Sequence, residues 1–171
     1  MYFFSRLVDS LLVFLSKIDR PKLVFEVLQI VADLSLYKSE ELVQMGFTKP
    51  LISWVSLGAP LYQELAVLAL GNIAGDGPQM RDFVINNGVI QPLLALVNQE
   101  TPITLLRNVT WTMSNLCRNK TISTPVEVLM QCLPVLAQLV KHSDRKVLAD
   151  ACWALSYLAD SSDEIQVIIF Q

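Results

Sequence analysis

The sequence predicts an all-α solenoid, and three observations point to this class. Trp111 and Asn115 stand four residues apart in an apolar segment, a spacing that places both side chains on one face of a helix. The same design returns 42 residues later in residues 148–160, and 43 residues earlier in residues 66–76 with leucine in the tryptophan position. Residues 25–35, a further 39 residues back, keep the apolar outline without either member of the pair. Four copies at this spacing are typical of armadillo or HEAT-type helical repeats.

The repeats make the chain one elongated array, not several separate domains. Of its 171 residues, 53% are hydrophobic and 17% charged, which is ample for a core. We expect a right-handed superhelix of about 3.5 to 4 repeats. The expected repeats are 1–36, 37–76, 77–120 and 121–160, with the start of another at 161–171.

Proline and glycine mark the helix boundaries in the first half of the chain. Pro21 indicates a new helix, because proline is tolerated at a helix start but not in its interior. Ser39 is a favourable N-cap for a short helix that Gly46 ends, and Gly58 to Pro60 marks the next break. The helices expected here are 7–17, 22–36, 39–44, 50–57 and 61–74.

The second half repeats this arrangement. Gly88 ends a short helix that starts at Pro78, and Pro134 is either a kink or a boundary within a longer helical segment. A turn at residues 142–144 precedes the last complete helix. The helices expected here are 78–87, 89–98, 102–118, 126–140 and 145–159, and those at 22–36, 61–74, 104–118 and 145–159 are expected to line the concave face.

Charge and hydropathy exclude several classes of partner. The net charge of −3 and the pI near 5.1 argue against nucleic acid, which selects a basic surface, but they permit a basic partner. No stretch reaches the ~18 uninterrupted apolar residues that a membrane helix requires. Asp9 interrupts the apolar start of the chain, which argues against a signal peptide.

No constellation of residues indicates catalysis, a metal or a cofactor. His142 is the only histidine, and neither a glycine-rich phosphate loop nor a metal-ligand spacing is present, so we expect no enzyme. Cys117, Cys132 and Cys152 form no CxxC pair and indicate no disulfide framework. We expect Cys117 and Cys152 to be small buried hydrophobic residues in a reducing compartment.

Three stretches resemble the importin-α family of armadillo-repeat nuclear import adaptors almost letter for letter: residues 70–77, 106–120 and 148–157. The similarity covers nearly the whole chain, is weakest before residue 60, and corresponds to roughly the second to fifth of the family's ten repeats. The resemblance implies a module that binds lysine- and arginine-rich nuclear localisation signals of cargo proteins. It also implies residence in both cytoplasm and nucleus.

The resemblance assigns roles to particular residues. Asparagines would pair with the backbone of an extended peptide, tryptophans would flank the stems of its lysines, and carboxylates would meet the ammonium groups. Without the resemblance, the tryptophans could be core aromatics, the asparagines caps, and Asp76 the cap of the helix at Pro78; Trp54 is expected in the core. The implied peptide-binding residues are Asn72, Asp76, Asn108, Trp111, Asn115, Asp150, Trp153 and Tyr157.

The chain also departs from the family pattern. Gln29 and Leu68 stand where tryptophan is expected, and Asp33 stands for asparagine. Losing two tryptophan clamps at ~1 kcal/mol each would weaken peptide binding by tens of fold. The alternative is therefore a degenerate or truncated paralogue, an interaction scaffold without import activity. Further departures fall at Tyr37, Leu42 and Leu65.

The ends of the sequence lead to two further expectations. Only Arg6 is basic before Leu7, so importin-β is not expected to bind the chain directly, the groove should stay open, and captured cargo should not be carried into the nucleus. Apolar residues at the two ends are expected to favour self-association. They are Tyr2, Phe3 and Phe4 at one end and residues 167–170 at the other.

Overall fold

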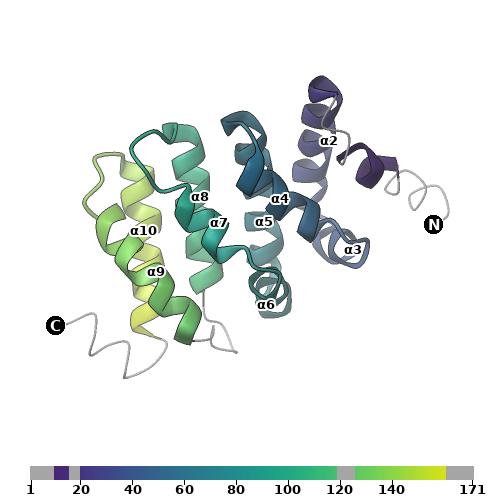
Figure 1. The fold of residues 1–171 in the computed structure, drawn as a ribbon. Helices are drawn as coiled ribbons and strands as arrows, with labels where there is room; N and C mark the ends of the chain where they lie inside the picture. Colours follow the sequence, from purple (N-terminus) through teal and green to yellow (C-terminus); the bar gives the residue numbers. More distant parts are fainter. Residues whose placement is uncertain (1–9, 16–19, 119–125, 161–171) are drawn as a thin grey trace.

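The structure, a computed structural model, describes residues 10–15, 20–118 and 126–160. Within these ranges the regular structure is helical: residues 10–15 form one helix, and nine more follow (Figure 1). These nine are α2 (Pro21–Leu34), α3 (Ser39–Gln44), α4 (Thr48–Leu57), α5 (Pro60–Asp76), α6 (Pro78–Asn86), α7 (Ile90–Ala95), α8 (Ile103–Cys117), α9 (Val126–Leu139) and α10 (Arg145–Ala159).

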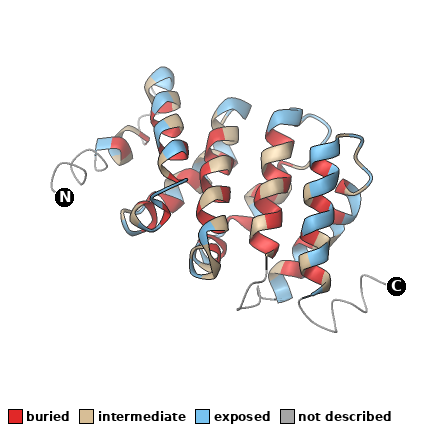
Figure 2. Ribbon diagram, turned by 180° about the vertical axis from the view of Figure 1, so that it is seen from behind, coloured by how far each residue is buried: buried red, intermediate tan, exposed pale blue. Residues whose placement is uncertain are grey.

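The helices form a solenoid in which each repeat packs on its neighbours. The long helices α2, α5, α8 and α10 stand in one row, with α5 between α2 and α8, and α8 between α5 and α10 (Figure 2). Helices α4, α7 and α9 form a second layer, visible on the near side in Figure 1. Buried residues lie on the faces that the helices turn towards one another, which produces a continuous core along the array.

Backbone conformation explains several of the boundaries. Gly46 and Gly88 follow α3 and α6 with φ of 86° and 87°, the left-handed region that glycine adopts without steric cost. Pro21, Pro60 and Pro78 each stand in the first turn of a helix, where the missing N–H would have no intrahelical acceptor.

Most of the expected helices are present, with shifts of one or two residues at their ends. Helices 39–44 and 145–159 begin and end as expected. The expectation that Ser39 is an N-cap is wrong, because Lys38 is the N-cap residue and the Ser39 hydroxyl donates to the Ser35 carbonyl at 2.9 Å. The helix expected at 89–98 is shorter, because after Ala95 the backbone closes into turns and the Asn98 side chain donates to the carbonyl of Ala95. Helix α9 runs through Pro134, so the boundary alternative is wrong.

Part of the expected structure lies outside the described residues. The helix expected at 7–17 is seen at 10–15, and the segment from residue 161 onwards is not described. The apolar residues of the two chain ends lie there too, so self-association remains a prediction. No helix within the described ranges is both long enough and apolar enough to cross a bilayer.

The expectation of burial holds for Cys117 but is wrong for Cys152, which is exposed. On α8, Thr110 occupies the place equivalent to Cys152 and is buried, and α8 has long neighbouring helices on both sides, α5 and α10. Helix α10 packs on α8 and α9, which leaves Cys152 and Leu148 on its opposite, uncovered face. Burial at this repeat position therefore depends on the following repeat as well as on the residue itself.

Candidate functional site

The eight expected peptide-binding residues lie on three neighbouring helices of one row. Asn72 and Asp76 belong to the last turns of α5, and Asp150, Trp153 and Tyr157 to α10. Asn108, Trp111 and Asn115 lie on α8 between them. Spacings of three and four residues keep each set on one helix face, and the stacking of α5, α8 and α10 aligns the three faces.

Two depressions form on this surface. The first, the α5 depression, has a volume of about 330 Å³ and brings together Asn72, Asp76, Trp111 and Asn115. Ser35, Ser39 and Arg118 also line it.

The second, the α10 depression, has a volume of about 480 Å³ and is lined by Asn108, Trp111 and Asp150. Glu64, Thr104, Arg107 and Lys146 complete its walls. Because Trp111 lines both depressions, they form consecutive parts of one groove with its indole between them.

Trp153 and Tyr157 lie beyond these depressions and form an aromatic surface of their own. Their rings stack at a centroid distance of 6.0 Å with an interplanar angle of 27°. Trp153 is 60% exposed, so a side chain of a ligand has access to its ring. A core role for this tryptophan is therefore excluded, whereas Trp111 is half-buried at the edge of the groove.

The two asparagines connect neighbouring repeats. The Asn115 side-chain N–H donates to the carbonyl of Gly71 on α5, at 3.0 Å. Asn72 donates to the Ser35 hydroxyl at 2.9 Å and more weakly to the carbonyl of Ala32 at 3.4 Å. Neither asparagine acts as a helix cap, and neither Oδ1 accepts a hydrogen bond from the residues that the structure describes. Each Oδ1 can accept a hydrogen bond from the backbone N–H of an extended peptide.

Two glycines of α5 allow α8 to approach closely at this point. A Cβ on Gly71 would overlap the Trp111 ring and the Thr112 hydroxyl. A Cβ on Gly75 would stand 3.0 Å from the Asn115 side-chain nitrogen. The tryptophan and the asparagine of α8 therefore lie each against a glycine one repeat earlier, and the four-residue spacing of the pair matches that of the glycines.

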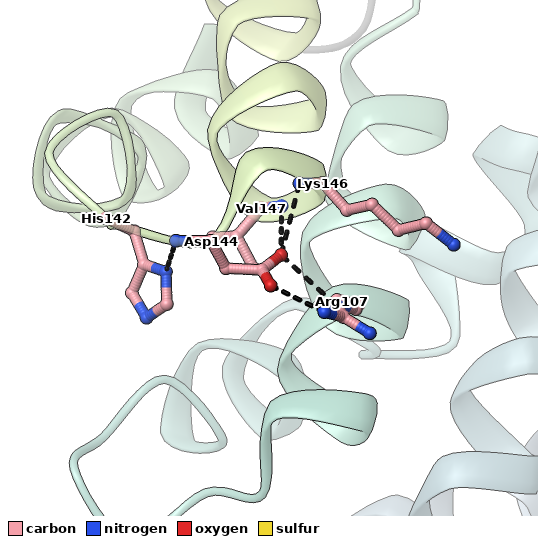
Figure 3. A network of polar contacts seen from close by, with 5 residues as sticks. All are labelled: Arg107, His142, Asp144, Lys146 and Val147. Atoms are coloured by element: carbon pink, nitrogen blue, oxygen red, sulfur yellow. Dashed lines mark hydrogen bonds and ion pairs between the residues drawn. The ribbon is translucent and has the colours of Figure 1, made fainter.

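A charged network holds α10 against α8 (Figure 3). Arg107 binds both carboxylate oxygens of Asp144, at 3.1 and 2.6 Å, and this guanidinium holds the pKa of Asp144 well below its usual range. Asp144 also caps α10 by accepting hydrogen bonds from the backbone N–H groups of Lys146 and Val147. His142 Nδ1 accepts a hydrogen bond from the Asp144 backbone N–H at 3.0 Å. The network fixes α10, and with it Trp153, relative to Trp111.

The two carboxylates of the site differ in environment. Burial raises the pKa of Asp150, and the nearby Lys146 charge opposes this increase. Asp76 is exposed at the end of α5, and Gly77, not Asp76, is the N-cap residue of α6. The structure therefore does not support the alternative that Asp76 is a helix cap. Its carboxylate is instead accessible from the α5 depression.

The positions that depart from the family pattern do not rebuild the missing clamps. The Gln29 side chain donates to the Asp33 carboxylate at 3.4 Å, so these two residues contact each other on α2. Leu42 and Leu65 are buried, and Tyr37 is 83% exposed.

Trp54, expected in the core, is half-buried away from the groove. Its indole N–H donates to the Leu15 carbonyl at 3.1 Å, and its ring lies 5.3 Å from that of Tyr62. The core expectation is thus met only in part, because one edge of the ring lines a separate apolar depression.

Sequence reasoning missed several residues of the groove. Thr104 and Lys146 each stand four residues before a position of the expected site, and Glu64 stands eight residues before Asn72, so extending the helical period by one or two turns would have found them. The Thr104 hydroxyl donates to Glu64 at 2.8 Å, which links α8 to α5. The Arg81 side chain is only 1% exposed and donates to the Arg118 carbonyl at 2.7 Å, which holds the end of α8 in place. No sequence pattern indicates that contact.

Among the described residues, no group of histidine, cysteine and acidic side chains is arranged to hold a metal ion. What the groove offers is an aromatic face, amide oxygens and carboxylates in a row, an arrangement suited to non-covalent capture of an extended cationic chain.

Comparison with known proteins gives consistent matches. The profile of the Armadillo/beta-catenin-like repeat family matches residues 77–118 and 125–160. Importin subunit alpha-2 of Arabidopsis thaliana is 39% identical over 160 residues, which cover 91% of this chain. Importin subunit alpha-3 of the same plant is 43% identical over 169 residues, or 96% of this chain. The chain spans only about a third of the length of these relatives, 30% and 32%.

Solved structures agree on the fold. A designed armadillo repeat protein in complex with the peptide (KR)4 superposes with a TM-score of 0.79 at 18% identity, covering 92% of this chain and 66% of its own. A second designed armadillo repeat protein gives 0.80 at 17% identity, covering 91% and 66%. At these identities the likeness establishes the armadillo fold alone.

Proposed function

We propose that this chain binds lysine- and arginine-rich signal peptides in the groove of α5, α8 and α10. It would do so as a partial and divergent member of the importin-α family of non-enzymatic armadillo-repeat proteins. The single observation that carries the proposal is the placement of Trp111 between the two depressions. One depression contains Asn72, Asp76 and Asn115, and the other contains Asn108 and Asp150.

The chemistry of capture follows from these groups. The Oδ1 atoms of Asn72 and Asn115 accept hydrogen bonds from peptide N–H groups, which holds the chain extended across the helices. The alkyl stem of a lysine packs on the Trp111 ring, with about 0.5–2 kcal/mol of cation–π attraction. Asp76 receives the ammonium group at the exposed end of the α5 depression.

A role in nuclear import extends this proposal from peptide to cargo. The relatives are importin subunits alpha, which supports an adaptor that works in both cytoplasm and nucleus. The chain aligns with about a third of their length, so transport by this chain remains a proposal.

A second candidate, an armadillo interaction scaffold without import activity, is favoured by one observation. Gln29 and Asp33 bond to each other where the family has a clamp and a backbone-binding amide, so α2 adds no aromatic slot. Leu68 is half-buried and provides none on α5. Peptide would then be held by α8 and α10 alone or not at all.

Titration of a fluorescent (KR)4 peptide separates the candidates. The Trp111→Ala, Asn115→Ala double variant should lose about thirtyfold in affinity, since each side chain contributes ~1 kcal/mol. Gln138→Ala, an exposed change on α9 in the other layer, is the control and should bind like the original chain. Absent binding, or equal binding by all three proteins at equal helicity, would favour the scaffold.

A further inference from the structure

Lys146 is a cation inside a groove that we propose to bind cations. It lies in the first turn of α10, where its backbone N–H donates to the Asp144 carboxylate at 3.1 Å. Its side chain extends away from Asp144 (Figure 3) and lines the α10 depression with Trp111 and Asp150. Among the described residues, no carboxylate is close enough to its ammonium group to form an ion pair.

Lys146 partly offsets the negative charge of the side chains that line the α10 depression. Glu64 and Asp150 are its two acidic side chains. Arg107 is neutralised by its paired contact with Asp144, so Lys146 is the unpaired positive charge of the described wall. The carboxylates of Glu64 and Asp150 and the ammonium group of Lys146 together leave a small net negative charge in this depression. A cationic side chain of a ligand would nevertheless have to approach the Lys146 ammonium group to reach Asp150.

The α5 depression also combines a carboxylate with a cation. Asp76 lies at the exposed end of α5, and Arg118, half-buried at the end of α8, lines the same depression. A cation therefore lines each part of the groove.

We propose that Lys146 is a specificity-determining residue that substitutes for a basic ligand side chain in the α10 depression, so that the preferred peptide carries an uncharged residue there. This inference rests on the proposed function and names its ligand more closely. The ligand is an interrupted basic peptide and not a continuous basic run.

Charge reversal at Lys146 tests the inference with a matched control. Lys146→Glu and Arg145→Glu give the same net charge and place the same acid in the first turn of α10, but only Lys146 lines the groove. The probes are (KR)4 and eight single-glutamine versions of it. Lys146→Glu should bind (KR)4 about fivefold tighter than the original chain, because repulsion becomes attraction across a partly solvated gap. Arg145→Glu should change the affinity by less than about twofold.

The glutamine scan locates the subsite. In the original chain, one glutamine position should leave affinity unchanged or improved, and in Lys146→Glu the same position should lose several-fold. If the two reversals tighten (KR)4 binding equally, or if Lys146→Glu does not tighten it, the inference is overturned while peptide binding itself stands. If (KR)4 binds to none of the three proteins, both the inference and the proposed function are rejected.

Discussion

At the scale of single residues, the groove depends on positions where no side chain is present. Gly71 and Gly75 let the Trp111 ring and the Asn115 amide lie directly on α5. A glycine inside a helix normally costs about 0.5–1 kcal/mol relative to alanine, so its use here indicates a packing requirement.

Gly71→Ala should therefore destabilise the protein despite its better helix propensity. The new methyl would overlap the Trp111 ring and the Thr112 hydroxyl, and overpacking of this kind typically costs ~1–3 kcal/mol. Urea unfolding followed by circular dichroism measures the change, and (KR)4 affinity should fall as Trp111 is displaced.

Gly77→Ala is the control for this substitution. Its backbone is extended, with φ of 166°, and no atom lies within 4 Å of the Cβ position. Equal stability of the two alanine variants would contradict the proposed role of Gly71.

Which residues share a face was predictable from the sequence, but which atoms they bind was not. Trp111 and Asn115 share a face because they are four residues apart, and this follows from helix geometry alone. That Asn115 donates to Gly71, and that Cys152 is exposed, depends on where the adjacent repeat packs. Ser35, which the end of α2 contributes to the α5 depression, carries no signal at the helical period of α5 or α8.

At the scale of helices, one ion pair links α10 to α8 in addition to their apolar packing. Arg107 on α8 holds both oxygens of Asp144, which also caps α10, so a single carboxylate contributes to both the position and the start of that helix.

The stability of the protein should fall in acid partly through Asp144. Because Arg107 lowers its folded pKa below the unfolded value of about 3.9, the contribution is complete above that value and is lost as pH falls further. Asp144→Asn keeps a side chain that can cap α10 but removes the charge. Unfolding midpoints in urea between pH 6 and 3 should therefore decline less steeply in this variant. An identical slope in both proteins would show that the ion pair contributes nothing.

Pro134 gives a second prediction at this scale. It lies exposed inside α9, where proline cannot donate a hydrogen bond to the Met130 carbonyl. Pro134→Ala should raise the free energy of unfolding by ~1 kcal/mol, after allowance for the greater freedom of the unfolded chain. Pro60→Ala, at the start of α5, should give no increase, because the N–H at that position has no intrahelical acceptor. Denaturant titration of the two variants makes the comparison.

Helix positions were accessible from the sequence because proline, glycine and capping residues act locally. Gly46 follows the end of α3 and Asp144 caps the start of α10, but α3 begins at Ser39 without a side-chain cap. The short α7 does not, because it ends where the Asn98 side chain turns back to Ala95, a contact that a periodic pattern does not encode. Pro134 was ambiguous because packing of the apolar face can keep a helix continuous through a proline.

At the scale of the whole molecule, the repeat turns one helix design into a groove. A spacing of about 40 residues places the α5, α8 and α10 faces side by side, so residues distant in sequence line one surface. The position of this surface could be predicted from the period. Its balance of charge could not, because Lys146, Arg107 and Asp144 acquire their roles only when α10 docks on α8.

The indole N–H signals of the three tryptophans in a ¹⁵N–¹H spectrum test most directly whether this groove binds a basic peptide. Trp111 and Trp153 lie on the proposed binding face, whereas the Trp54 indole is bonded to Leu15 away from it and serves as an internal control. On titration with (KR)4, the account predicts progressive shifts of the Trp111 and Trp153 signals and a stationary Trp54 signal. A shift confined to Trp54, or equal shifts of all three, would contradict it.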